Sequence, residues 1–151
     1  MKVIIAGSRS ITDMRWVEKA TRLFSEHEGK ITEVICGGAP GVDTIGKEWA
    51  ESQNIPVKRF RPKWRDWSGL PEHKIRIKQS PNGRSYNALA GFNRNEEMAG
   101  YADALIAIWD GKSSGTAHMI DTMYRLNKPV HVVGIECDYR RGSAESEVFK
   151  S

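Results

Sequence analysis

Two glycine-rich turns hold the residues of this chain best suited to bind an anion. The turns are residues 37–43 and 110–116; each follows a short apolar run and opens a stretch with helical periodicity. Glycine lets the backbone approach a phosphate closely, and the N–H groups and dipole of a helix N-terminus supply positive potential. Together the turns predict a bridging ligand, a nucleotide or a phosphorylated sugar. The alternative is that both are ordinary tight turns.

Apolar runs of strand length alternate with these helical stretches along most of the chain. The expected strands are residues 3–6, 32–36, 57–60, 104–109 and 129–133. This alternation predicts an α/β fold with a doubly wound, mainly parallel five-stranded sheet. A helix capped at Asn93 is expected before the fourth strand. Ligands of such sheets bind at the carboxyl ends of strands, where both glycine turns and residues 7–9 would lie.

The stretch at about 61–90 departs from this alternation and predicts a basic hairpin insert. Two isoleucines alternate with Lys and Arg over residues 74–78, and residues 80–83 form a turn signal. Nine Lys or Arg against two acids give residues 58–84 a charge of +7, whereas the rest of the chain carries −3. Local positive charge attracts phosphates, nucleic acid or an acidic partner. A merely solvated insert is the alternative.

Composition and length indicate one domain over residues 1–134, followed by a C-terminal tail at 135–151. The chain has 151 residues, 39% hydrophobic and 28% charged, which is typical of a soluble globular protein. No apolar run approaches the roughly 20 residues that span a membrane, and no signal-peptide pattern opens the chain. Its two cysteines, Cys36 and Cys137, lie far apart. We therefore expect a cytoplasmic protein with free thiols, no metal site, no cofactor and no membrane partner.

Several well-known motifs are absent. A P-loop at Gly111-Lys112-Ser113 would need a glycine at position 106, which is isoleucine. The dinucleotide fingerprint G-x-G-x-x-G is missing at Gly7 and at Gly37, and His-Glu-x-x-His and Cys-x-x-Cys do not occur. A metalloenzyme is therefore not expected.

Four blocks of sequence resemble the SLOG superfamily, and its YspA/YpsA-related branch most closely. The blocks are Ile5-Ala6-Gly7-Ser8-Arg9, Gly37-Gly38-Ala39-x-Gly41-Val42-Asp43, Asn93-Arg94-Asn95-x-x-Met98 and Trp109-Asp110-Gly111-x-Ser113-x-Gly115-Thr116. This superfamily also holds the LOG phosphoribohydrolases and the DprA/SMF DNA-processing proteins. The resemblance implies a Rossmann-like sheet that binds nucleotides or nucleotide-derived ligands, often in homo-oligomers.

The resemblance leaves enzymatic activity open. LOG-type enzymes cleave the N-glycosidic bond of nucleoside 5′-monophosphates with an Arg and a Glu. Arg94 occupies the similar place for the Arg, but Met119 stands where the acid would be. A carboxylate is needed there to stabilise an oxocarbenium-like centre or to activate water. Glu97 is the candidate partner of Arg94 in catalysis, with Glu96, Asp43 and Asp110 as other substitutes.

The candidate ligand-binding residues come from the three loops and the helix start at Asn93. They are Gly7, Ser8, Arg9, Gly37, Gly38, Gly41, Asp43, Asn93, Arg94, Asp110, Ser113, Ser114, Gly115 and Thr116. Arg94 is expected to pair with phosphate or with Glu96 or Glu97 on its own helix. Asp43 would repel a phosphate, so it is assigned to a ribose hydroxyl, a backbone N–H or a helix cap.

Three functions follow from these features. The first is a sensor or sequestering protein for a nucleotide-type ligand, in which the hairpin is a lid or the arm of a homo-oligomer. The second is LOG-like hydrolysis of an N-glycosidic bond. The third is single-stranded nucleic-acid binding through residues 58–84, because Trp64, Trp67 and Tyr86 interleave with basic residues there and aromatic rings stack on bases.

Overall fold

Six parallel strands form the main sheet of the computed structural model, which describes residues 1–134 and 147–150. Their order is β3-β2-β1-β6-β7-β8, and each neighbouring pair is parallel. The strands are β1 (Lys2–Gly7), β2 (Glu33–Cys36), β3 (Val57–Arg59), β6 (Ala104–Trp109), β7 (Val130–Gly134) and β8 (Glu147–Lys150). The α/β fold class is confirmed, and the sheet has one strand more than predicted because β8 comes from the tail.

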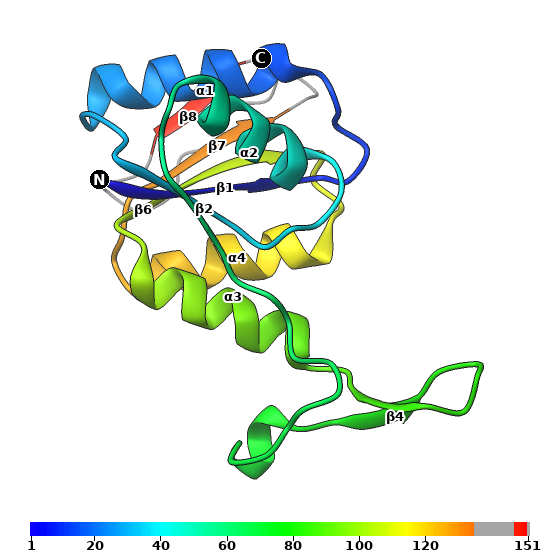
Figure 1. Ribbon diagram of the computed structural model, residues 1–151. Helices are drawn as coiled ribbons and strands as arrows, with labels where there is room; N and C mark the ends of the chain where they lie inside the picture. Colours follow the sequence, from blue (N-terminus) through cyan, green and yellow to red (C-terminus); the bar gives the residue numbers. More distant parts are fainter. Residues whose placement is uncertain (135–146, 151) are drawn as a thin grey trace.

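Two helices cover each face of the sheet (Figure 1). The helices α1 (Met14–His27) and α2 (Val42–Ser52) pack on one face, and α3 (Ala90–Tyr101) and α4 (Ser114–Arg125) pack on the other. Successive residues of β1 point to opposite faces, so Ile5 joins the core of the first pair and Ile4 that of the second. A strand covered on both faces is apolar throughout, which explains the continuous runs.

The strand order reverses between β1 and β6. From β1 the chain winds outward through β2 to β3, and it then crosses back to β6, beside β1. In open parallel sheets this reversal separates the loops at the strand ends and leaves a crevice for ligands. The loops after β1, β2 and β6 all end at this crevice.

The basic hairpin lies within the crossover from β3 to β6 and extends away from the sheet (Figure 1). It contains a 3₁₀ turn, η1 (Glu72–Lys74), and two antiparallel strands, β4 (Ile77–Gln79) and β5 (Ser85–Asn87). Its base is fixed by Asn87, which is fully buried and bonds the backbones of Lys74, Arg76 and Leu89 at 2.9–3.1 Å.

Helix α3 begins at Ala90, three residues before the predicted cap. Leu89 is the N-cap residue and offers no capping side chain. The Asn93 side chain instead donates to the Lys74 carbonyl at 2.9 Å, which ties α3 to the insert. The expectation that Asn93 caps this helix is therefore wrong. By contrast, the Asp13 side chain caps α1, accepting from the Arg15 N–H.

Candidate functional site

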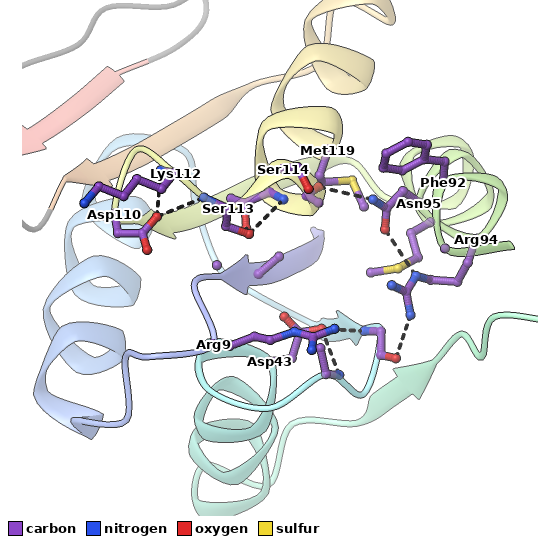
Figure 2. Close-up of a pocket in the computed structure, with 18 of the residues that line it drawn as sticks. Arg9, Asp43, Phe92, Arg94, Asn95, Asp110, Lys112, Ser113, Ser114 and Met119 are labelled. Carbon is purple, nitrogen blue, oxygen red and sulfur yellow. Dashed lines mark hydrogen bonds between the residues drawn. The ribbon is translucent and has the colours of Figure 1, made fainter. Parts of the chain in front are cut away.

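A cavity of about 630 Å³ opens where the strand order reverses. Its walls come from the end of β1, the turns after β2 and β6, the N-terminal half of α3 and the insert (Figure 2). Ten of the predicted ligand-binding residues line it: Gly7, Arg9, Gly37, Asp43, Arg94, Asp110, Ser113, Ser114, Gly115 and Thr116. The structure therefore brings the three predicted loops and Arg94 together around one space.

Two glycines near the cavity lie where neighbouring backbone leaves no room for a side chain. A Cβ at Gly7 would lie 1.9 Å from the carbonyl oxygen of Ile108 on the neighbouring strand. Gly41 has φ of 80°, and a Cβ there would lie 2.5 Å from the Arg9 backbone. Gly41 thus packs against the β1 loop and does not line the cavity.

The Asp43 carboxylate occupies the N–H donors of the first glycine turn. It accepts from the backbone of Gly37 at 3.1 Å and of Ala39 at 3.4 Å. The backbone N–H is one of the partners predicted for Asp43. Burial raises the pKa of Asp43 to about 6, against the lowering effect of these bonds and of Arg94. The Val42 N–H donates to the Ser8 carbonyl at 3.3 Å, so this helix start is also engaged within the protein.

Two arginines cover the same turn. The Arg94 guanidinium donates to the Gly37 carbonyl at 2.8 Å and to Asn95 Oδ1 at 3.1 Å. A Cβ at Gly38 would meet Arg59 Nε at 2.4 Å. Arg94 forms no ion pair with Glu96 or Glu97 in the part of the chain that the structure describes, and Glu96 instead pairs with Lys74 at 3.8 Å. The alternative that Arg94 bonds a carboxylate on its own helix is therefore wrong.

The second glycine turn leaves donors open to the cavity. Asp110 accepts from the N–H groups of Lys112 at 2.8 Å and Ser113 at 3.0 Å, and these bonds hold its pKa below the ordinary value. Ser113 is the N-cap of α4. The next two N–H groups, those of Ser114 and Gly115, have no acceptor among the described residues. A Cβ at Gly115 would meet nothing within 4 Å, so space lies beside these donors.

Asn95 joins α3 to α4 beside the cavity. Its Nδ2 donates to the Gly115 carbonyl and to His118 Nδ1, both at 3.2 Å. Burial lowers the pKa of His118, which suits a neutral ring that accepts at Nδ1. Phe92 stacks on the same ring with centroids 4.3 Å apart. Figure 2 shows Phe92, Asn95 and Arg94 together on the α3 side of the cavity.

Five predicted site residues do not line the cavity: Ser8, Gly38, Gly41, Asn93 and Glu97. Ser8 is buried, and its Oγ accepts from the Asp110 N–H at 2.9 Å, which joins two of the loops. Glu97 is exposed and borders a separate cavity of about 70 Å³, which Arg94 also reaches. Met119, buried at 2% exposure, lines the main cavity where LOG-type enzymes would have their acid.

Sequence reasoning missed the cavity walls that come from the insert and from within α3. Trp64, Ala88, Gly91, Phe92, Asn95 and Met98 line the cavity and were not assigned to the site. Asn95 and Met98 had a signal because both lie in the block that resembles the SLOG superfamily, and Trp64 had one only as an aromatic residue of the basic insert. Within residues 1–134 and 147–150, no group of three or more His, Cys, Asp or Glu could hold a metal ion. No helix of that part of the chain is long and apolar enough to cross a membrane.

Two comparisons by sequence relate this chain to known proteins. The model of the YAcAr family, described as the YspA, cpYpsA-related SLOG family, matches residues 1–67. The gene 61 protein of Mycobacterium phage D29 is 31% identical over 138 residues, which cover 85% of this chain and 93% of that protein.

Two solved structures of DNA processing protein A (DprA) share the fold. The protein from Streptococcus pneumoniae has a TM-score of 0.63 at 14% identity over 99% of this chain. The protein from Helicobacter pylori, described for its single-stranded DNA binding mode, has a TM-score of 0.59 at 21% identity; the match covers 97% of this chain and 68% of that one. This chain spans 58% of the pneumococcal chain. From the relative in phage D29 and the family match, this chain belongs to the YspA, cpYpsA-related SLOG family.

Proposed function

We propose that this protein binds a nucleotide or a nucleotide-derived ligand with phosphate and ribose groups in the cavity, as a sensor or sequestering protein. The observation that carries the proposal is the start of α4, where the N–H groups of Ser114 and Gly115 have no acceptor among the described residues and lie beside open space. A helix N-terminus of this kind favours a phosphate through its donors and its dipole.

The side chains around this helix start support the same ligand class. Arg9 and Lys112 line the cavity, and neither forms an ion pair with another described residue. The hydroxyls of Ser113, Ser114 and Thr116 also line the cavity and can donate hydrogen bonds to the oxygen atoms of a sugar or a phosphate. Because Asp43 fills the first glycine turn, we assign the phosphate to the second turn, with Arg94 and Arg9 on its flank.

Replacing Ser114 tests this assignment directly. Proline is favoured at the first position of a helix, and the preceding Ser113 has φ −60° and ψ 118°, which a following proline allows. Ser114→Pro therefore removes one N–H donor while retaining the helix. By titration calorimetry with a nucleotide panel, we expect affinity to fall by about tenfold or more, as for a hydrogen bond to a charged group. The control Ser114→Ala removes the hydroxyl and retains the N–H.

Two outcomes oppose the proposal. The absence of heat for the wild-type protein with mono-, di-, cyclic and ADP-ribosyl nucleotides would refute it. Equal nucleotide affinity of Ser114→Pro and the wild type would mean that the phosphate does not bind at the start of α4.

A second candidate function is hydrolysis of the N-glycosidic bond of the bound nucleotide. The observation in its favour is Asp43, a cavity-lining carboxyl group whose pKa of about 6 suits proton transfer near neutral pH. Release of free base that is lost in Asp43→Asn, with nucleotide affinity retained, would support hydrolysis. Recovery of intact nucleotide after long incubation would exclude it for that substrate.

A third candidate, single-stranded nucleic-acid binding, is favoured by the insert. The side chains of Arg61, Lys63, Arg65, Arg76, Lys78 and Arg84 form no ion pair with another described residue. Trp64 and Tyr86 border an outer, open cavity of about 720 Å³ with Lys63 and Arg65. Each phosphate contact on a single strand should add about −0.7 to the slope of log affinity against log salt. Binding of oligonucleotides that is unchanged in Lys63→Ala/Arg65→Ala/Arg84→Ala would exclude this surface.

A further inference from the structure

We infer that the insert supplies the base-recognition wall of the cavity, with Trp64 and Phe92 packing against a planar heteroaromatic base. This inference rests on the proposed function and specifies what that function leaves open. It requires a ligand with a base, not a sugar phosphate alone. It also gives the insert a role in choosing the ligand.

The exposed aromatic side chains of the described residues converge on the cavity. Trp64 is 44% exposed and Phe92 is 41% exposed, and both line the same space. The other exposed large hydrophobic side chains, Ile77 and Leu126, do not line it. An aromatic ring left open to water beside a cavity gains by contact with another ring, because stacking buries apolar area.

Both aromatic rings are held in place without a ligand. The Trp64 carbonyl accepts from the Asn87 N–H at 2.7 Å, which fixes its backbone to β5. The Trp64 ring makes an edge contact with Tyr86, with centroids 6.3 Å apart, and also lies against Gly91 at the start of α3. The Phe92 ring is stacked on His118. A preorganised wall of this kind loses little conformational entropy when a base binds.

Phe92 lies at the α3 end of the cavity, away from the second glycine turn. Figure 2 shows Phe92 on the α3 side of the α4 N-terminus and Lys112 and Asp110 on the opposite side. The N–H groups of Ser114 and Gly115, which have no acceptor among the described residues, lie between these two sides, because Asn95 of α3 bonds the Gly115 carbonyl at the start of α4. A molecule with a phosphate at one end and an aromatic ring at the other matches this division; a free phosphosugar satisfies only one half of it.

The insert is a fixed wall, because its base is anchored to α3. Asn87 bonds three backbone segments of the insert, and Asn93 of α3 donates to the Lys74 carbonyl. Trp64 also borders the outer cavity of the insert, so its indole separates the two spaces. Changing Trp64 therefore changes the wall of the main cavity with no change in the phosphate-binding backbone.

The test compares ligands with and without a base. Titration calorimetry would use AMP, GMP, CMP and UMP against ribose 5-phosphate, with wild-type protein, Trp64→Leu and Phe92→Leu. We expect the best nucleotide to bind the wild type more tightly than ribose 5-phosphate does. Trp64→Leu should weaken that nucleotide by about tenfold, in the range of base–aromatic stacking, and leave ribose 5-phosphate unchanged. Trp67→Leu, in the same insert but not lining the cavity, is the matched control.

The outcomes separate this inference from the proposed function. If ribose 5-phosphate binds the wild type as tightly as every nucleotide, the phosphate site stands and the base wall is wrong. If Trp64→Leu weakens both ligand types equally, Trp64 is structural and the inference is also wrong. If no ligand binds the wild type, both proposals fail. If sedimentation shows that the wild type is a dimer and that Trp64→Leu is a monomer, Trp64 contacts a second copy of the chain, and the inference is overturned.

Discussion

The Oδ2 atom of Asp43 lies 3.1 Å from the backbone nitrogen of Gly37, so a carboxylate of the protein fills the first glycine turn. The second turn has a similar aspartate, Asp110, which accepts from the N–H groups of Lys112 and Ser113, whereas those of Ser114 and Gly115 have no acceptor among the described residues. The two turns look alike in sequence, yet Asp43 engages the backbone donors of the first turn, whereas the second turn keeps two donors open to the cavity.

Asp43 should make the stability of the protein depend on pH. Its folded pKa of about 6 is above the ordinary value of 3.8, so the folded state binds the proton more tightly than the unfolded state does. The contribution of protonated Asp43 to the free energy of unfolding is fully present below pH 4 and is lost as the pH rises through 6. The difference corresponds to about 3 kcal/mol. Urea unfolding at pH 4 and pH 7.5 should show this loss in the wild type relative to Asp43→Asn.

Asparagine is the suitable replacement because Asp43 uses one oxygen for both backbone bonds, and an amide oxygen can accept the same pair. A wild-type protein whose stability relative to Asp43→Asn does not change between these pH values would show that Asp43 is ionised at little cost.

Gly115→Ala should impair ligand binding without unfolding the protein. A Cβ at this position meets no atom within 4 Å and projects beside the open N–H groups of α4. Alanine in a helix is favoured over glycine by about 0.5–1 kcal/mol, so the thermal midpoint should hold or rise. The affinity for the best nucleotide should fall. Gly100→Ala, in α3 and equally free of neighbours, is the matched control and should leave affinity unchanged.

Gly7→Ala, in contrast to Gly115→Ala, should destabilise the fold. The added Cβ would lie 1.9 Å from the backbone oxygen of Ile108, at the pairing of β1 with β6 in the middle of the sheet. Neither strand can move without disturbing both cores. We expect a loss of about 3 kcal/mol or more in the free energy of unfolding, measured in urea. A stable Gly7→Ala protein would mean that these two strands separate more easily than their packing indicates.

Asn87→Ala should loosen the insert before it affects the sheet. The substitution leaves partly buried backbone groups of Lys74, Arg76 and Leu89 without their partner, at a cost of about 1 kcal/mol for each lost hydrogen bond. Hydrogen exchange should speed up at the amides of Arg76 and Leu89 and remain slow in β1. Asn82→Ala, at the hairpin turn, is the control, and its effect should be confined to the tip near Arg84.

The strands and helices that cover the sheet could be predicted because their signals are local. The run Ala104–Trp109 is apolar throughout, since α1 and α4 both contact it, and Asp13 is a capping residue at the start of an amphipathic stretch. The start of α3 could not be predicted from capping because Leu89 gives no side-chain signal. The strand β8 was missed because the tail has little hydrophobic periodicity.

Only the part of the site that lies in the loops after the parallel strands could be predicted from the sequence. Loops after parallel strands meet at one edge, so Arg9, Gly37 and Ser113 could be grouped in advance. Trp64 and Phe92 could not, because their approach depends on how Asn87 and Asn93 anchor the insert to α3. Contacts of this kind join residues far apart in the chain, and no short pattern encodes them.

The position of the insert has a consequence for how ligand preference can change. The donors proposed for the phosphate are backbone groups of α4, which substitutions largely preserve. The proposed base wall includes a side chain from a segment that adds no strand to the main sheet. Relatives with a different insert could therefore distinguish new bases with the same phosphate site and nearly the same folding stability.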